Sequence, residues 1–372
     1  MQLKILIYIS FILVCLNINL VLAQDCWSSF RNNQALTGFT KVNTAKSYKL
    51  LTTFKTTDAI KSSPIFCNGN VVIGSNDGNI YSITTTGKQN WKFSAGTSIE
   101  ASPLLLDNVV YVGSLEGNFY AIDYKTGELK WKYKTDGQIS GSANWNLASD
   151  KKQKNILVGS YDYNLHCINA LTGKTVWKYE SNNYINGSAA INNNTAVFGG
   201  CDGFLHLVDV NTGKAKDKIN INNYIASSVA IDGNKAFFGN YDGDFFCLDL
   251  ISKKIVWQNT GYGTFISSPA ISGNYVIINS QDKKVYCFDK LTGKSIWIFS
   301  TLQKIDSSPV IAINTVVVTS NDGRLYILDL VTGNKVWSYE IGSPIKSSPC
   351  VTRDFIIVGA DDGKVYIFGV IK

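Results

Sequence analysis

Residues 307–337 read SSPVIAINTVVVTSNDGRLYILDLVTGNKVW, and this stretch decides the fold. It consists of short segments of mainly alternating apolar residues, separated by residues that favour turns. Between the second and third segments lies Asn321-Asp322-Gly323, a strong hairpin signal because Asn and Gly tolerate the positive φ of a tight turn. The predicted strands are 307–313, 315–319, 324–329 and 335–339. The stretch therefore predicts a four-stranded antiparallel meander.

The same pattern recurs along almost the whole chain. The turn pair at Asp322 has counterparts at Asp77-Gly78, Glu116-Gly117, Asp162-Tyr163, Asp202-Gly203, Asp242-Gly243, Asp282-Lys283 and Asp362-Gly363. Successive copies are 40 residues apart, except that the first two intervals are 39 and 46. A fixed period of this length indicates a repeat architecture, because a lone meander cannot bury both of its faces.

Eight such units predict an all-β fold, an eight-bladed β-propeller of four-stranded antiparallel blades. The last unit ends after its third strand, at residues 365–372, so its fourth strand must come from elsewhere. Fourth-strand tryptophans precede the next first strand by ten positions, and ten positions before Ser62 is Thr52. Residues 50–56 are therefore predicted to complete the last blade. This N-terminal strand would close the ring and remove its open edges.

The N-terminus of the chain has the features of a secretory signal. Lys4 precedes an apolar run at 5–16, which is too short to span a membrane. Neither Cys15 nor Cys26 follows the small residue that a bacterial lipid anchor requires, so we expect no anchor. The predicted organisation is a signal peptide at 1–23, an N-terminal extension at 24–48 and a single propeller at 49–372. The protein is therefore expected to be secreted or periplasmic.

Composition and charge exclude several classes of protein. The chain is 45% hydrophobic and 17% charged, which is ordinary for a globular protein. Its formal net charge is +7, and Arg31, Arg324 and Arg353 are its only arginines. The clustered basic residues of a nucleic-acid-binding protein are missing. We expect a monomer that binds no nucleic acid.

The spacing between the third and fourth strands carries a family resemblance. Ala121-Ile122-Asp123, then Thr126-Gly127, then Trp131 is similar to the tryptophan-docking motif of the pyrroloquinoline-quinone-like (PQQ-like) repeat propellers. The resemblance implies that six tryptophans pack between neighbouring blades, namely Trp91, Trp131, Trp177, Trp257, Trp297 and Trp337. The N-terminal part of the chain also resembles the opening stretch of such proteins, at Trp27, Phe30, Arg31, Thr37 and Gly38. This family includes quinoprotein dehydrogenases, which bind a quinone and calcium, and non-catalytic scaffolds such as the BamB-type outer-membrane assembly factor.

The candidate reactive residues have structural explanations. His166 and His206 occupy a third-strand position that is Tyr or Phe in the other units, so we expect them to fill a half-buried aromatic slot. The recurrent Asp residues lie in turns, where Asp accepts hydrogen bonds from the backbone. The small position beside the docking tryptophan holds Cys167, Cys247 and Cys287. The remaining cysteines can pair in an order that the sequence leaves open: Cys26, Cys67, Cys201 and Cys350. No catalytic, cofactor-binding or metal-binding residue is predicted.

Positions that vary between the units are the candidates for function. Six side chains directly before the first strands are expected to ring one mouth of the central channel and to bind a ligand or only water: Lys61, Glu100, Ser140, Asn186, Asp306 and Lys346. One possible partner surface is the insertion of the third unit, with an exposed Trp145 beside Lys151 and Lys152. A second lies at Lys216 and Lys218, which flank Asp217 where a docking tryptophan is replaced.

These observations favour a non-catalytic, secreted or periplasmic propeller that acts as a protein-interaction scaffold, BamB-like in architecture. No cofactor is expected under this hypothesis. The alternative is a small PQQ-dependent alcohol or sugar oxidoreductase, for which PQQ and calcium would be the cofactors. A carbohydrate-binding module is the third hypothesis. The sequence does not identify the partner or the ligand, because fold does not determine function.

Overall fold

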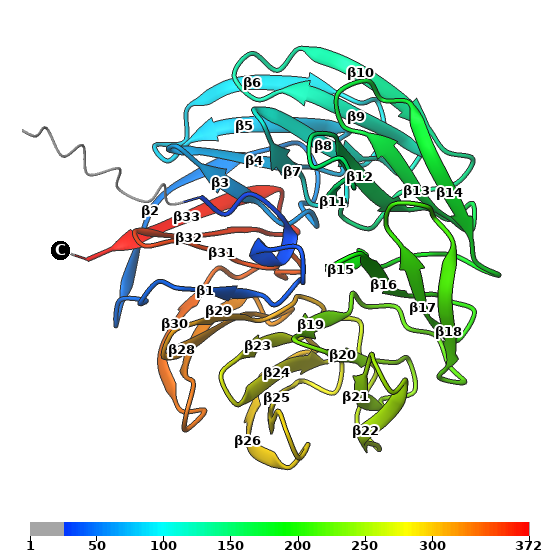
Figure 1. Ribbon diagram of the computed structural model, residues 1–372. Helices are drawn as coiled ribbons and strands as arrows, with labels where there is room; N and C mark the ends of the chain where they lie inside the picture. Colours follow the sequence, from blue (N-terminus) through cyan, green and yellow to red (C-terminus); the bar gives the residue numbers. More distant parts are fainter. Residues whose placement is uncertain (1–25, 372) are drawn as a thin grey trace, which may run out of the picture.

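The computed structural model describes residues 26–371, which form eight blades of four antiparallel strands around a central axis, and the sheet of blade 7 gains a fifth, parallel strand from the N-terminal segment (Figure 1). Blades 1 and 2 contain β3 (Ile65–Cys67), β4 (Asn70–Gly74), β5 (Asn79–Thr84), β6 (Gln89–Ser94), β7 (Leu104–Leu106), β8 (Val109–Gly113), β9 (Asn118–Asp123) and β10 (Leu129–Lys134). Blades 3 and 4 contain β11 (Asn144–Leu147), β12 (Lys154–Gly159), β13 (Asn164–Asn169), β14 (Thr175–Glu180), β15 (Ala190–Asn192), β16 (Thr195–Gly199), β17 (Phe204–Asp209) and β18 (Ala215–Asn220).

The second half of the ring repeats this order. Blades 5 and 6 contain β19 (Ala230–Asp232), β20 (Lys235–Gly239), β21 (Phe245–Asp249), β22 (Lys254–Asn259), β23 (Ala270–Ser272), β24 (Tyr275–Ser280), β25 (Lys284–Asp289) and β26 (Ser295–Ser300). Blades 7 and 8 contain β27 (Val310–Ala312), β28 (Thr315–Thr319), β29 (Arg324–Asp329), β30 (Lys335–Glu340), β31 (Cys350–Val351), β32 (Phe355–Gly359), β33 (Lys364–Val370) and β2 (Tyr48–Lys55). The predicted eight-bladed propeller is confirmed.

The ring is closed by a strand from the N-terminal end, as predicted. β2 runs antiparallel to β33, with Thr53 opposite Tyr366, and Figure 1 shows the blue strand beside the red one. The strand begins two residues before the predicted start, because Tyr48 already pairs with Val370. A Cβ atom added to Gly87 of blade 1 would lie 2.8 Å from Thr52 Oγ1. Thr52 thus occupies the position that a docking tryptophan has in other blades.

Neighbouring blades cover both faces of each sheet, so the inner strands are buried almost throughout. In blade 7, the second strand, β28, is buried except for its first residue, which is partly exposed. The strand at the outer edge, β30, is largely accessible. The first strand is shorter than the predicted 307–313, since Ser307 and Ser308 are engaged outside the ladder. Ser307 Oγ donates to Thr319 O at 2.6 Å, and Ser308 N donates to Ser348 Oγ at 2.9 Å.

Docking tryptophans join one blade to the next. In five cases the indole Nε1–H donates to a backbone carbonyl of the following blade at 2.9–3.1 Å: Trp91 to Tyr124, Trp131 to Ala170, Trp177 to Val210, Trp257 to Lys290 and Trp297 to Leu330. The ring lies over a glycine of that blade, and a Cβ atom added to Gly333 would be 2.5 Å from the Trp297 ring. Trp337 packs against Tyr48 and Phe368 of the closing blade.

One blade junction uses charge in place of this stack. Asp217 stands at the tryptophan position of β18, and Lys253 stands at the glycine position of the next blade with φ 59°. The Lys253 ammonium forms an ion pair with the Asp217 carboxylate. Both members of the Trp–Gly pair are therefore replaced together. The two replacements, one in each blade, thus form a single contact in the structure.

Residues 26–40, which we call the strap, cross one end of the channel (Figure 1, blue) and include η1 (Phe30–Asn32) and β1 (Phe39–Thr40). Backbone N–H groups of successive first strands donate to strap carbonyls at 2.7–2.9 Å: Leu105 to Ser28, Ile191 to Gln34, Ile231 to Ala35, Ile271 to Thr37 and Ile311 to Gly38. β1 pairs in parallel with β27. Residues 26–40 of the predicted N-terminal extension are therefore bonded to the first strands of the propeller.

The strap is also fixed by a disulfide and by a buried arginine. Cys26 is bonded to Cys67 of blade 1, which settles one pairing that the sequence left open. Arg31 is 2% exposed, and its guanidinium donates to the carbonyls of Pro269 and Pro309 at 2.6 and 2.5 Å. Desolvation by burial lowers the pKa of Arg31 to about 9, so the group stays charged at neutral pH.

The predicted signal peptide, 1–23, and its cleavage before Gln24 lie outside the described residues. Between residues 26 and 371, no helix has the length and apolar character to cross a bilayer.

Candidate functional site

The channel contains a small polar cavity of about 180 Å³ that reaches Phe30 of the strap. The segments directly before the first strands of all eight blades form the rest of its wall. The six predicted ring residues all line it: Lys61, Glu100, Ser140, Asn186, Asp306 and Lys346. Ala226 and Ile266 complete the ring at the two remaining blades. The structure therefore brings together side chains that are separated by up to 285 positions in the sequence.

A belt of serines forms the wall below this rim. Backbone N–H groups donate to serine hydroxyls of the next blade at 2.8–3.1 Å: Ser63 to Ser102, Ser102 to Ser142, Ser188 to Ser228, Ser228 to Ser268, Ser268 to Ser308, Ser308 to Ser348 and Ser348 to Ser63. The last bond closes the belt between blades 8 and 1. Because each hydroxyl accepts a backbone proton, its own proton is left to be donated, and the cavity wall is rich in neutral donors.

The rim is charged on one side and neutral on the other. On the charged side, Lys61 Nζ is 2.6 Å from Glu100 Oε1, and Lys346 Nζ is 2.5 Å from Asp361 Oδ2. Asp306 on the same side accepts hydrogen bonds from Gln281 and Asn321 at 2.9 and 2.7 Å. The neutral side runs from blade 3 to blade 6 and is formed by Ser140, Asn186, Ala226 and Ile266.

Two acceptors on the neutral side are buried without a hydrogen-bond partner among the described residues. They are Asn186 Oδ1 and Ser227 Oγ. Both residues line the cavity. Buried polar atoms are normally paired with protein or with ordered water, so these two atoms mark a place in the wall where a hydrogen-bond partner is still required.

The cavity does not fit a tricarboxylate quinone such as PQQ. Its volume of about 180 Å³ is smaller than the roughly 300 Å³ at which pockets for drug-sized ligands begin. The rim cations Lys61 and Lys346 are already neutralised by carboxylates within the protein. Within residues 26–371, no three His, Cys, Asp or Glu side chains are grouped as a metal ion requires. The charge and the space that a quinone and calcium need are not assembled here.

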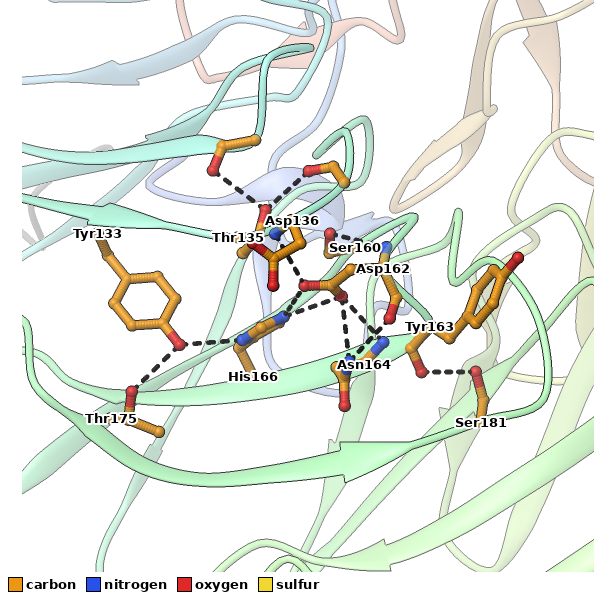
Figure 2. A network of polar contacts seen from close by, with 12 residues as sticks. Tyr133, Thr135, Asp136, Ser160, Asp162, Tyr163, Asn164, His166, Thr175 and Ser181 are labelled. Atoms are coloured by element: carbon orange, nitrogen blue, oxygen red, sulfur yellow. Dashed lines mark hydrogen bonds and ion pairs between the residues drawn. The ribbon is translucent and has the colours of Figure 1, made fainter.

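Both histidines are integrated into buried hydrogen-bond networks, and Figure 2 shows that of His166. His166 Nε2 lies 3.0 Å from Asp162 Oδ2, and its Nδ1 lies 3.0 Å from the Tyr133 hydroxyl of the preceding blade. His206 repeats this arrangement with Asp202 at 3.1 Å and Tyr179 at 3.0 Å. The histidines occupy the predicted aromatic position of the third strand, but the prediction that this position is half-buried was wrong. Both histidine side chains are completely buried, because the blade edges close over them.

A compensating exchange within the repeat explains why His is tolerated there. Where the third strand carries Tyr326, its hydroxyl donates to Asp322 and the facing fourth-strand residue is Phe299. Where it carries His166, the facing residue is Tyr133, which satisfies the second ring nitrogen. Both ring nitrogens therefore have partners, and the site holds no nucleophile for a base to activate. The Tyr at the preceding fourth strand was the sequence signal for this network.

The turn carboxylates beneath these histidines remain ionised. Burial alone would raise the pKa of Asp162, but the hydrogen bond and charge of His166 outweigh it. Backbone N–H groups of Asn164 and Asp136 act in the same direction, and the net pKa lies well below its usual range. Asp162 accepts from Asn164 N at 3.0 Å, the contact expected for Asp in such a turn.

Four free cysteines of the described residues are not activated as thiolates. Cys167, Cys247 and Cys287 lie directly opposite docking tryptophans in the strand register, as predicted, and are fully buried. Burial raises the pKa of Cys167 and of Cys247 to about 12. Cys201 is partly exposed near the channel mouth, and burial raises its pKa as well. A thiol with a raised pKa is a poor nucleophile at neutral pH.

The predicted partner surfaces differ in accessibility. Trp145 is only partly exposed, and Lys154 lies over its ring. Its backbone carbonyl accepts a hydrogen bond from Gln34 of the strap. The neighbouring Lys151 and Lys152 are exposed.

At the second predicted surface, both lysines form ion pairs with aspartates of the protein itself. Lys216 pairs with Asp209 at 3.2 Å, and Lys218 pairs with Asp202 at 3.2 Å. The Lys218 ammonium also lies 4.0 Å from the centroid of the Phe204 ring.

A hollow of about 710 Å³ lies beside the insertion, between blades 2 and 3. It was not predicted from the sequence, since its wall combines two blades. Trp131, Tyr111 and the strongly exposed Leu171 contribute apolar surface, whereas the charged part of the wall holds three lysines and two aspartates: Lys130, Lys152, Lys154, Asp107 and Asp150. This blade 2–3 groove joins part of the predicted partner surface to an apolar pocket.

Two family models match the chain. One is described as the beta-propeller of the beta-alanine-activating enzyme and matches residues 146–371, more than half of the chain. The other is described as the outer membrane protein assembly factor BamB and matches residues 46–183. No curated protein sequence shows a significant match.

Several solved structures share the fold. BamB from Moraxella catarrhalis has a TM-score of 0.74 and 17% identity, covering 87% of this chain and 100% of its own. A europium-containing methanol dehydrogenase has a TM-score of 0.79 and 13% identity, covering 93% of this chain and 98% of its own. The quinohemoprotein alcohol dehydrogenase from Comamonas testosteroni has a TM-score of 0.78 and 14% identity, covering 94% and 81%. The chain belongs to the β-propeller family described for the beta-alanine-activating enzyme and, through its docking repeats and the BamB match, to the PQQ-like repeat propellers.

Proposed function

We propose that this protein is a secreted or periplasmic, non-catalytic β-propeller that acts as a protein-interaction scaffold, BamB-like in architecture. The observation that carries the proposal is the blade 2–3 groove, which places an apolar pocket beside exposed lysines. Exposed apolar surface rimmed by polar residues is typical of a protein-binding site. By contrast, the candidate reactive groups of the described chain are paired or buried, including both histidines and the rim lysines.

The secretory part of the proposal is supported by the Cys26–Cys67 disulfide. Structural disulfides persist in oxidising compartments and are rare in the cytosol. The predicted signal peptide at 1–23 points to the same compartments.

The groove also indicates the chemistry of the partner. Lys130 and Lys154 already pair with Asp123 and Asp107. Lys151 and Lys152 remain exposed beside the pocket. A protein segment with an apolar anchor and flanking acidic residues would complement this surface.

The test is cross-linking of the native chain in its host followed by identification of the captured proteins. We expect a defined protein partner whose capture falls at least tenfold in the Lys151→Glu/Lys152→Glu variant. Lys294→Glu/Lys335→Glu, which changes exposed lysines on other blades, is the matched control. Equal capture by both variants would refute the groove as the docking site.

The oxidoreductase alternative is tested separately. Purified protein is incubated with PQQ and Ca²⁺, and the bound chromophore and dye-coupled oxidation of alcohols and sugars are measured. Our proposal expects neither signal. Stoichiometric quinone binding with dye reduction would overturn it.

A further inference from the structure

Four exposed tyrosines lie on one sector of the channel-mouth face. They are Tyr163, Tyr184, Tyr224 and Tyr241, exposed by 41, 41, 52 and 52%. Within the described residues, these are the tyrosines with large exposure, and the tryptophans and phenylalanines are more covered. All four lie in turns at the blade 3–4 and blade 4–5 junctions. We call them, together with Tyr161, the tyrosine arc.

The arc is built by local sequence that only these blades carry. Asn182-Asn183-Tyr184-Ile185 recurs as Asn222-Asn223-Tyr224-Ile225. In both copies the second Asn side chain accepts a hydrogen bond from the tyrosine backbone N–H, at 2.8 and 2.6 Å. In the other blades the position of the tyrosine is held by Ala59, Ser98, Gln138, Thr264, Lys304 and Pro344.

The tyrosines form two adjoining groups. Tyr161 stacks on Tyr184, with ring centroids 4.7 Å apart and an interplanar angle of 26°, and Tyr163 lies 5.4 Å from Tyr184. In the next junction, Tyr241 N donates to Tyr224 O at 2.9 Å, which holds these two residues side by side. Aromatic side chains of this kind offer an apolar face and a hydroxyl at one site.

The inner end of the arc meets the neutral side of the cavity rim. Asn186 follows Tyr184 by two residues, and Ser227 follows Tyr224 by three. The unpartnered acceptors Asn186 Oδ1 and Ser227 Oγ therefore lie at the base of the two tyrosine groups, and Ser227 is only 2% exposed. The arc thus leads from exposed aromatic rings to buried acceptors that lack partners.

Two of the carboxylates beneath the arc are compensated within the protein. Asp162 is bound by His166, and Asp202 is bound by His206 and Lys218, whereas Asp242 beside Tyr241 is exposed. The adjacent rim is neutral, in contrast to the charged residues of blades 7 to 2. A charged ligand would gain little here, whereas a neutral molecule with many hydroxyls finds amide, hydroxyl and aromatic groups together.

We propose that the tyrosine arc binds a neutral, β-linked hexopyranose oligosaccharide. A β-linked hexopyranose with equatorial hydroxyls has two apolar C–H faces, which pack flat on tyrosine rings. Its hydroxyls project sideways, toward the tyrosine hydroxyls and toward the neutral cavity rim that Asn186 and Ser227 line. This site goes beyond the proposed scaffold function and lies on different blades from the blade 2–3 groove.

The experiment is isothermal titration of the full mature chain with cellohexaose, laminarihexaose and maltohexaose, followed by the variant Tyr184→Ala/Tyr224→Ala. We expect binding of a β-linked hexasaccharide, weaker binding of α-linked maltohexaose, and at least tenfold loss of affinity in the variant. Leu291→Ala/Val331→Ala, which removes exposed aliphatic side chains in turns between third and fourth strands, should leave affinity unchanged. Far-UV circular dichroism and the midpoint of urea unfolding verify that both variants fold.

Two outcomes would overturn the proposal. One is no binding of any β-linked hexasaccharide by the folded protein. The other is unchanged affinity in the tyrosine variant. If that variant instead lost a cross-linked protein partner while no sugar bound, the arc would be a protein-docking site. The Lys151→Glu/Lys152→Glu variant should retain sugar binding, which separates this result from the test of the scaffold function.

Discussion

Replacing Gly333 with alanine tests whether tryptophan docking holds neighbouring blades together. Gly333 has φ 72°, and a Cβ atom there would lie 2.5 Å from the Trp297 ring. Ordinary carbon–carbon contacts are about 3.5–4.0 Å, so the ring must move away. That movement also weakens the bond from Trp297 Nε1 to Leu330 O, which is 2.9 Å long.

Gly342 supplies a matched control. Its φ is 85°, and nothing lies within 4 Å of an added Cβ atom. An alanine at such a φ costs about 1–2 kcal/mol, offset by about 0.4–1 kcal/mol from the less flexible unfolded chain. We therefore expect Gly342→Ala to lower the free energy of unfolding by about 1 kcal/mol. Overpacking adds about 1–3 kcal/mol at Gly333, which gives a loss of about 2–4 kcal/mol there.

The assay is equilibrium unfolding in urea, followed by tryptophan fluorescence and by far-UV circular dichroism. The difference between the two variants isolates the steric contact, because both carry the same backbone penalty. A Gly333→Ala variant within about 0.5 kcal/mol of Gly342→Ala would refute the reasoning. As a further check, Gly333→Ala should cost only about 1 kcal/mol when Trp297 is already alanine, since the clash is then gone.

Four other predictions follow from the structure. Deletion of residues 26–56 removes both β2 and the strap, so size-exclusion chromatography and urea unfolding should show loss of the cooperative monomer; a cooperative monomer would contradict the closure of the ring. Cys26→Ser should lower the free energy of unfolding by about 2–4 kcal/mol, the range for a disulfide with a sequence separation of 41. Cys201→Ser is the control, because Cys201 is free and its replacement removes no disulfide. The pKa of Asp162 is lowered in the folded state, so the ionised carboxylate stabilises the fold at pH values above its unfolded-state pKa of about 3.9, and this contribution is lost as pH falls. Asp162→Asn should therefore reduce the pH dependence of the free energy of unfolding below about pH 4. An unchanged pH dependence would argue against this role. Asp217→Ala should cost less than about 1 kcal/mol in urea unfolding because its ion pair with Lys253 is largely solvent-exposed, and a loss of several kcal/mol would show that this junction is held by charge.

The candidate site was predicted only in part from the sequence. The ring of six channel-mouth residues followed from their constant place before each first strand, and the structure brings all six to one cavity. The partner surface at Lys216 and Lys218 was inferred from the replacement of a docking tryptophan by Asp217 between them, and the structure pairs both lysines with aspartates. Trp145 was expected to be exposed, but it is only partly exposed, and Lys154 lies over its ring.

The sequence by itself determined the number of blades, the approximate strands and the closing segment. These features depend on local signals that repeat, namely strand alternation, turn residues and the fixed interval from tryptophan to the next strand. Residues 50–56 could be assigned to the last blade because the interval continues across the chain ends.

Only the tertiary structure decided the course of the strap, the Cys26–Cys67 bond, the Asp217–Lys253 pair and the division of the mouth into charged and neutral sides. Each of these contacts joins residues that are distant in the chain or lie in different blades, and their chemistry varies from blade to blade. A repeat pattern specifies what all blades share. The contacts that distinguish one blade from another exist only after the ring has closed and brought those side chains together.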